Sequence, residues 1–178
     1  MSSLRLIHQE TQTSASSRIL VEDVFTSDYS IYKIVTSKFE TVGSDATALD
    51  MRFLSTSGTE ITNTNYEYAC LTLKAETTFS ERTGSNKNYL DNAFGGTDES
   101  PSTNMTVTYV YNPYEELYTA VTMDRTAITG TTSSNVSRGE KFIGLLKQTR
   151  RMGGFMLYET NSRPFQNGVI KVYGFRID

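Results

Sequence analysis

The chain has 178 residues, of which 37% are hydrophobic and 11% aromatic, so it can bury the core of one folded domain. Seventeen Lys and Arg against 20 Asp and Glu leave a formal charge of −3, too near balance for a nucleic-acid-binding or anionic-membrane-binding protein. Cys70 is the single cysteine, which excludes an intramolecular disulfide. No segment resembles a signal peptide or a membrane span, so we expect a soluble, unprocessed chain made in a reducing cytosol.

Short β-branched or aromatic runs alternate along the chain with clusters of Ser, Thr, Asn, Asp and Gly, which is the pattern of strands and turns. No helical periodicity competes with it, and no long internal repeat indicates a propeller or a solenoid. The expected strands lie, in chain order, at 4–9, 18–25, 29–40, 48–55, 65–75, 105–111, 117–125, 140–149, 154–160 and 168–177.

Several of these runs alternate with period two. Leu49, Met51 and Phe53 would share one face of a strand, as in a half-buried antiparallel sheet. The segments 29–35 and 168–175 are apolar on both faces in places. Such strands are typical of the middle of a sandwich, or of a sheet that lies under a partner.

These patterns predict an all-β, antiparallel two-sheet β-sandwich. The irregular strand spacing favours a jelly roll over a barrel of regular hairpins. The Ser- and Thr-rich stretch 11–17 would separate a short N-terminal arm, 1–17, from a single domain, 18–178, and short arms of this kind often pair with a neighbouring subunit. The connector 83–104 is too long for a tight hairpin and is expected to be a binding or packing loop, or to be locally disordered.

Few residues suggest catalysis. His8 is the single histidine and is expected to be an exposed residue of the arm, while Cys70, inside a strand, is expected to be a small buried hydrophobe. A glycosidase would need two carboxyl groups about 5–10 Å apart. Solvated loop charges are commoner, so we expect no enzyme. The candidates for such a pair are Asp91, Asp98, Glu99, Glu115 and Glu116.

Ligand motifs are weak as well. Asp91, Asn92, Asp98 and Glu99 offer oxygens to calcium but lack the spacing of an EF-hand loop, so neither a metal nor a cofactor is expected. The pairs Gly95-Gly96 and Gly153-Gly154 lack phosphate-loop spacing and are interpreted as turn residues with positive φ. The basic run within 145–154 could meet a phosphate or an acidic partner, but three such charges more often form a solvated edge.

The excess of tyrosine is more informative, since Tyr combines an apolar ring with a polar tip and is favoured at protein contacts and on sugar-stacking surfaces. The competing interpretation is that most of these rings pack inside the sandwich. Together with the apolar N-terminal residues, they give a set of expected partner contacts: Leu4, Leu6, Ile7, Tyr89, Phe94, Tyr114 and Tyr118.

Three motifs carry a family resemblance: Tyr29, Tyr32 and Ile34; then Arg52, Phe53, Ser57 and Gly58; then Gly168, Ile170, Lys171, Tyr173 and Gly174. Their order resembles that of small jelly-roll-like virion proteins of tailed bacteriophages, especially marine ones. The resemblance spans 18–177 and is weakest over 76–165. Its motifs consist of sheet and turn residues, and no catalytic residues come with it.

The resemblance implies a non-enzymatic virion protein, made in the bacterial cytoplasm, that decorates or cements the capsid through contacts with other virion proteins. We expect a homo-oligomer, such as a trimer, with no nucleic-acid partner and no membrane insertion. One alternative is a tail or tail-fibre component that binds a host receptor or glycan through tyrosine-lined loops. Another is a hydrolase that uses the loop carboxylates.

Overall fold

The computed structural model describes residues 4–42, 48–75, 79–95, 104–129, 136–159 and 162–176. The regular elements in these ranges are all β-strands. The described residues therefore include no helix that could cross a membrane. The all-β class predicted from the sequence is confirmed.

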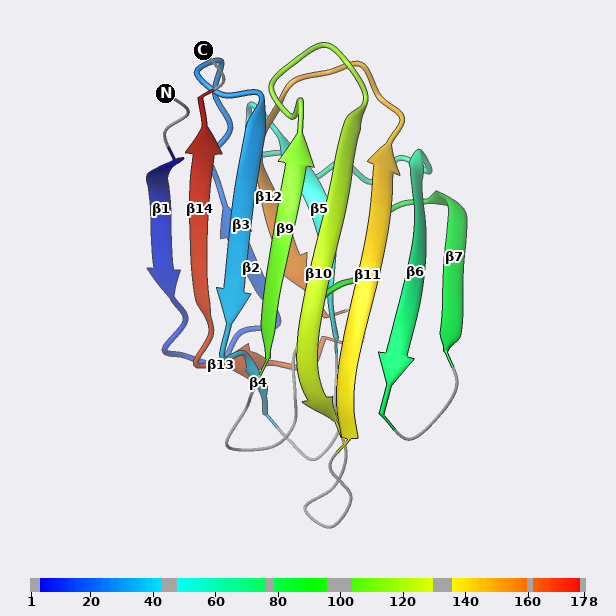
Figure 1. Cartoon of the computed structure of the whole chain (residues 1–178). Helices are drawn as coiled ribbons and strands as arrows, with labels where there is room; N and C mark the ends of the chain where they lie inside the picture. Colours follow the sequence, from blue (N-terminus) through cyan, green and yellow to red (C-terminus); the bar gives the residue numbers. More distant parts are fainter. Residues whose placement is uncertain are drawn as a thin grey trace.

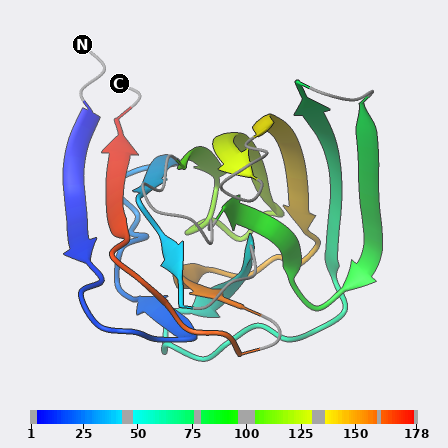
Figure 2. The same ribbon diagram turned by 90° about the horizontal axis from the view of Figure 1, so that it is seen from below.

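The strands form two packed antiparallel sheets (Figures 1 and 2). In spatial order, the large sheet contains β1 (Leu4–Thr11), β14 (Val169–Phe175), β3 (Ile31–Ser37), β9 (Met105–Tyr111), β10 (Thr119–Thr129), β11 (Val136–Leu146), β6 (Tyr66–Lys74) and β7 (Ser80–Lys87). The small sheet contains β2 (Arg18–Val21), β12 (Met152–Tyr158), β5 (Ala48–Ser55) and β8 (Leu90–Gly95). A separate pair joins β4 (Glu40–Thr41) to β13 (Phe165–Gln166).

The pairing is nested from the ends of the chain inward, which is the topology of a jelly roll. β1 pairs with β14, β2 with β12, β3 with β9, and β5 with β8. Pairing of β14 with β3 and of β12 with β5 then gives the two four-stranded units, β1-β14-β3-β9 and β2-β12-β5-β8. The remaining strands β10, β11, β6 and β7 widen only the large sheet.

The first strand belongs to the sandwich itself. β1 is paired with β14 along its length, with a bulge between Leu6 and His8, and Ser16 forms a further bridge to Phe165. The expected arm over 1–17 is therefore not separate from the sandwich, because Leu4–Thr11 are paired within the chain, and its pairing with a neighbouring subunit stays a prediction. β1 is an edge strand of the large sheet.

The connector 83–104 is more ordered than its composition predicts. β7 ends the large sheet, the chain crosses to the small sheet at Asn88 and Tyr89, and β8 ends that sheet; residues 96–103 lie outside the described residues. The sequence of β7, SERTGSNK, has no apolar alternation because most of its side chains are exposed at the edge of the sheet. Its period-two signal is consequently absent.

Two glycines expected in a turn lie in strand β12 instead. A Cβ on Gly153 would come within 3.0 Å of the Ser55 carbonyl oxygen, and a Cβ on Gly154 would collide with the Val21 carbonyl oxygen. These glycines allow neighbouring backbones to approach closely. Among the described glycines, the one with positive φ is Gly58, at 74°.

Alternate side chains from both sheets fill the space between them. Tyr66 crosses this core: its hydroxyl donates to the Ile61 carbonyl at 3.1 Å and accepts the Phe53 N–H at 3.0 Å. Burial raises the pKa of Tyr66, so the phenol stays neutral. Tyr32 makes the equivalent pair of bonds with the Thr26 backbone, at 2.8 and 2.7 Å. Tyr66 thus satisfies an N–H of strand β5 and a carbonyl of the segment after it, and Tyr32 satisfies both backbone groups of Thr26, which lies outside the strands.

One ion cluster lies inside the sandwich. The side chains of Arg125 and Glu140 are 3% and 0% exposed, and Arg125 Nη1 lies 3.0 Å from Glu140 Oε2. Arg138 and Thr72 bind the other carboxylate oxygen. Burial alone would raise the pKa of Glu140, but the charges of Arg125 and Arg138 outweigh it and hold this pKa below its ordinary value of 4.5.

We expect Tyr66→Phe to lower the free energy of unfolding by about 1–3 kcal/mol, because a buried backbone N–H and a buried carbonyl lose their common partner. Chemical denaturation would measure the change. Tyr118→Phe, at an exposed ring, is the matched substitution and should stay within about 0.5 kcal/mol of the wild type. Equal stabilities for the two variants would contradict the role assigned to Tyr66.

We expect Glu140→Gln to cost about 3–5 kcal/mol, because it leaves the Arg125 charge buried without its counter-ion. The pKa of Glu140 is lower in the folded than in the unfolded chain, so its contribution is complete above the unfolded value and is lost as the pH falls through the folded value. Unfolding measured from about pH 6 to 2 should therefore depend less on pH in the variant. Asp124→Asn, in an exposed ion pair with Lys141, should leave both properties unchanged.

Candidate functional site

The outward surface of the large sheet is unusually apolar, and we call it the open face. Inward residues of these strands are buried, whereas the outward ones are half-buried or exposed. The register aligns outward residues of neighbouring strands in rows. One row reads, across six strands, Leu4, Phe175, Ile31, Tyr111, Ala120 and Leu145. No charged side chain interrupts it across these six strands, and on the seventh strand, β6, it continues to Glu67.

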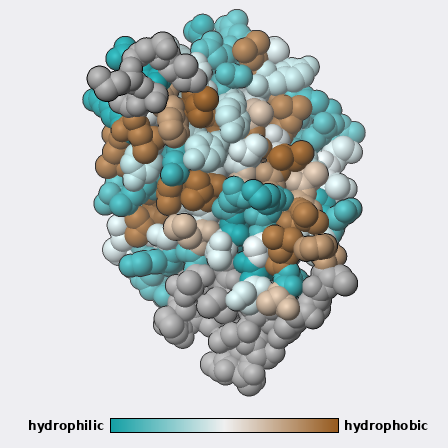
Figure 3. Space-filling model, in the orientation of Figure 1, coloured by the Kyte–Doolittle hydropathy of each residue, from teal (hydrophilic) through white to brown (hydrophobic). Residues whose placement is uncertain are grey.

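The next rows mix apolar and charged residues. The second contains Leu6, Tyr173, Lys33, Tyr109, Thr122, Ile143 and Ala69. The third contains Gln9, Lys171, Val35, Val107, Asp124, Lys141 and Leu71. Figure 3 shows this face, on which hydrophobic atoms recur from the β1 side to the β6 side with polar atoms between them. Leu6 and Ile143 are 48% and 61% exposed.

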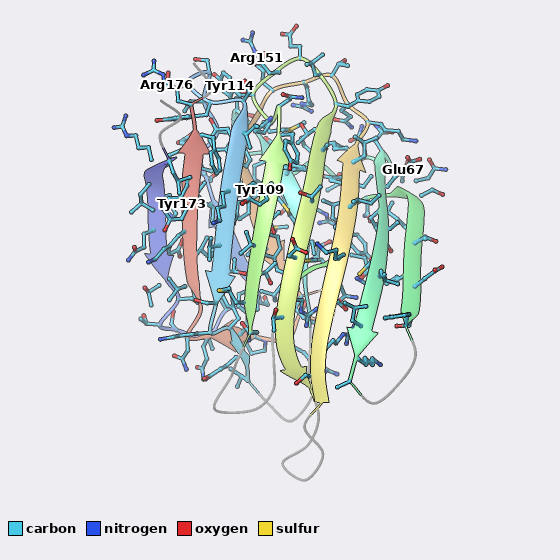
Figure 4. All side chains as sticks on the ribbon, viewed as in Figure 1. Glu67, Tyr109, Tyr114, Arg151, Tyr173 and Arg176 are labelled. Atoms are coloured by element: carbon cyan, nitrogen blue, oxygen red, sulfur yellow. The ribbon has the colours of Figure 1, made fainter. Side chains whose placement is uncertain are left out.

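Aromatic rings occupy the middle of the open face. Tyr109 on β9 and Tyr173 on β14 are both labelled in Figure 4, where Tyr109 lies near the middle of the large sheet and Tyr173 nearer its β1 edge. The rings of Tyr109 and Phe175 lie with centroids 6.0 Å apart, and the Tyr111 hydroxyl lies 3.3 Å from that of Thr122. Rings of this kind, with an apolar body and a polar tip, suit a protein contact.

The open face is hollowed where β11, β6 and β7 run side by side. The hollow has a volume of about 470 Å³. Ala69 on β6 projects outward between Ile143 on β11 and Thr83 on β7. Because its side chain is small, the surface is depressed at this position. The lining residues are Glu67, Tyr68, Ala69, Gly84, Ser85, Ile143, Gly144 and Leu145.

The basic run of the sequence borders one end of this face. Figure 4 places Arg151 and Tyr114 together at that end, where the Arg151 guanidinium lies 5.7 Å from the Tyr114 ring centroid and 3.9 Å from the Glu116 carboxylate. Lys147 forms an ion pair with Glu67. Two of these cations therefore already interact with groups of the chain itself.

The expected partner contacts fall into different environments. Leu4 and Leu6 are exposed on the open face, whereas Ile7, the bulged residue, is half-buried against the core. Phe94 is fully buried in the core, so its expected role in partner contact is corrected: the ring cannot reach a partner. The sequence could not distinguish it, because β8 has no clear alternation.

The tyrosines expected to form one binding surface are separated. Tyr89 lies edge-on to Tyr158, with ring centroids 6.1 Å apart, on the small-sheet side. Tyr114 lies against Arg151, and Tyr118 is exposed. The described ring contacts do not join Tyr89 to either of the other two, so the predicted tyrosine-lined platform is not assembled from these three residues.

The candidate catalytic groups are dispersed as well. Asp91 lies 3.4 Å from Arg82 and accepts the Tyr68 hydroxyl, while Glu115 and Glu116 are exposed. Asp98 and Glu99 lie outside the described residues. Within the described ranges, no group of three or more His, Cys, Asp and Glu side chains could hold a metal ion.

The two residues usual in nucleophilic catalysis have ordinary surroundings. Cys70 is buried in β6, as expected for a small hydrophobe, and burial raises the pKa of its thiol. A thiol with a raised pKa is a poor nucleophile. His8 is a half-buried residue of β1, 3.5 Å from Glu10, which corrects its expected place on an exposed arm.

The family motifs meet inside the fold. The Tyr29 ring covers Gly174, where an added Cβ would come within 2.5 Å of the ring, and packs edge-on to Tyr32 at 5.8 Å. A Cβ on Gly168 would come even closer to the Phe39 ring, at 2.0 Å. These residues therefore hold β14 beside β3, which is a structural role.

No protein-family model matches the chain, and no curated protein matches it. Two solved structures of the VP2 protein of infectious bursal disease virus are weakly similar to it. One, a mutant in derived T=1 particles, is 9% identical with a TM-score of 0.20 and is aligned over 99% of this chain and 40% of its own. The other, a VP2 subviral particle, is 11% identical with a TM-score of 0.16, over 99% and 41%. This chain thus spans about 40% of the length of VP2, and scores this low do not establish a common fold.

Proposed function

We propose that the chain is a non-enzymatic structural protein of a bacteriophage virion and docks on another virion protein through the open face. The observation that carries this proposal is the apolar, aromatic-rich outward surface of the eight-stranded sheet. An antiparallel sheet with one face in water normally carries polar residues there. A face that instead presents leucine, isoleucine, valine and tyrosine suits a protein partner.

The size of the open face is adequate for a specific contact. Eight strands about 4.8 Å apart span roughly 34 Å, and the seven residues of β9 span roughly 24 Å. The product is on the order of 800 Å², which is the area that each partner typically contributes to a standard interface. The charges on the face, such as Lys33, Asp124 and Lys141, would then fix orientation.

The family resemblance supports a place in the virion, with capsid decoration as the leading position and the tail or its fibres as the alternative. Copies of the chain are proposed to associate with one another, as a trimer or another symmetric set. The free edge of β1 and the exposed Leu4 and Leu6 are available for such contacts. Deleting this segment would remove a strand of the sheet, so point substitutions test docking better than truncation.

We expect Ile143→Glu to reduce incorporation into virions at least tenfold, because a carboxylate buried at an apolar contact has no partner there. The measurement is the amount of the chain per particle, by quantitative mass spectrometry of purified virions. Leu20→Glu is the matched control: it is an exposed leucine, 43% accessible, on the outward side of the small sheet, and should leave incorporation unchanged.

Circular dichroism and size-exclusion chromatography of both variants would establish that each is folded and would report the oligomeric state. Incorporation of Ile143→Glu at the wild-type level would exclude the open face as the docking surface. Absence of the wild-type chain from purified particles would reject the proposed virion role altogether.

A further inference from the structure

A second cavity lies on the other side of the molecule, on the outward surface of the small sheet. Its volume is about 320 Å³, and we call it the back pocket. It is lined by Ser17, Arg18, Arg52, Met156, Tyr158, Glu159 and Ser162. The small sheet lies behind the large one in Figure 1, so a partner seated on the open face would leave this pocket accessible.

The register of three adjacent strands assembles the pocket. Tyr158 on β12 pairs with Arg18 on β2, and Met156 on β12 pairs with Arg52 on β5. Because paired residues of neighbouring strands project to the same side, all four side chains face away from the core. The rigid frame of a sheet therefore positions them.

The two guanidinium groups share one carboxylate. Arg52 Nη1 donates to Glu60 Oε2 at 3.0 Å, and Arg18 binds the other oxygen of the same carboxylate. Arg52 Nε also donates to the Asn88 carbonyl at 3.1 Å, and Arg18 Nη2 lies 3.0 Å from the Met156 sulfur. Each arginine is thus held in place by the chain itself, so little side-chain entropy would be lost on binding a ligand.

Aromatic rings support one wall. The Arg52 guanidinium lies 4.7 Å from the centroid of the Tyr158 ring, and Tyr89 packs edge-on to that ring. Tyr89 is the single member of the sequence-predicted tyrosine group with a described contact to this pocket. Stacking further restricts Arg52, which is only 17% exposed.

The lining carries charges of both signs. Arg18, Arg52 and Glu159 line the pocket, Glu60 binds both arginines beside it, and Asp50 lies opposite Tyr158 in the sheet. Glu159 is buried and accepts the Arg163 N–H at 2.8 Å. A lining with guanidinium donors, a carboxylate acceptor and two serine hydroxyls suits a neutral ligand that both donates and accepts hydrogen bonds.

We propose that the back pocket binds a neutral, polyhydroxylated ligand of the size of one sugar ring, such as the terminal residue of a glycan. Hydroxyl groups pair with guanidinium and carboxylate alike, and the volume lies at the lower end of the range for small-molecule sites. This binding does not depend on the docking role of the open face.

The test is titration of the full chain with a panel of neutral hexoses, N-acetylhexosamines and uronic acids, followed by protein-detected NMR. We expect at least one neutral sugar to bind at about millimolar concentration, as single rings with few contacts do. Arg18→Ala should weaken that binding at least tenfold. Arg52→Lys should weaken it similarly, because lysine keeps the charge but loses the planar fork and the stacking on Tyr158.

Arg150→Ala, at an exposed arginine outside the pocket, is the matched control and should bind like the wild type. Thermal unfolding of each variant would separate lost binding from lost structure. The proposal is overturned if no sugar binds at about 10 mM, if Arg18→Ala and Arg52→Lys bind like the wild type, or if uronic acids alone bind. Ile143→Glu should retain sugar binding, so this result and the docking result are independent.

Discussion

Pairing of β14 with β3 is the contact on which the rest of the fold depends. It places the last strand of the chain between β1 and β3, and so connects the N-terminal edge of the large sheet to the middle. Two glycines of this segment leave room for aromatic rings next to the β14–β3 pair: Gly174 lies under the Tyr29 ring, and Gly168 lies under the Phe39 ring. A larger residue at either position would push β14 away from β3, with loss of the register that aligns the open face.

The same pairing explains why the first and third family motifs, which are distant in sequence, lie side by side in the fold. Tyr29 and Tyr32 come before or within β3, while Gly168 and Gly174 flank or belong to β14. Their shared role is to bury backbone and rings between the sheets. A resemblance based on such residues predicts architecture and carries no information on the partner-facing residues of the open face.

Much of the architecture could be predicted from the sequence, because strands with one buried face have period-two alternation. Each expected run overlaps an observed strand, and those at 48–55 and 105–111 have the observed bounds. β7 and β8 were missed for two different reasons. β7 is an exposed edge with almost no buried residue, and β8 follows a crossing between sheets that no local pattern signals. The burial of Phe94 is a consequence of that crossing, so composition alone could not predict it.

Both sheets have an outward surface, and the difference between them is the strongest reason to regard the open face as a contact surface. On the small sheet, Arg18, Arg52 and Tyr158 project outward and bind one another or Glu60, which is the polar arrangement expected beside water. On the large sheet, one outward row has no charged side chain across six strands, and the two rows beside it mix apolar residues with Lys33, Lys171, Asp124 and Lys141. The two outward surfaces therefore differ in degree: the large sheet exposes Leu4, Leu6, Leu71, Leu73 and Ile143, whereas Leu20 is the exposed leucine among the described residues of the small sheet. A partner that covers only the large sheet accounts for this difference, because water acts on both surfaces equally.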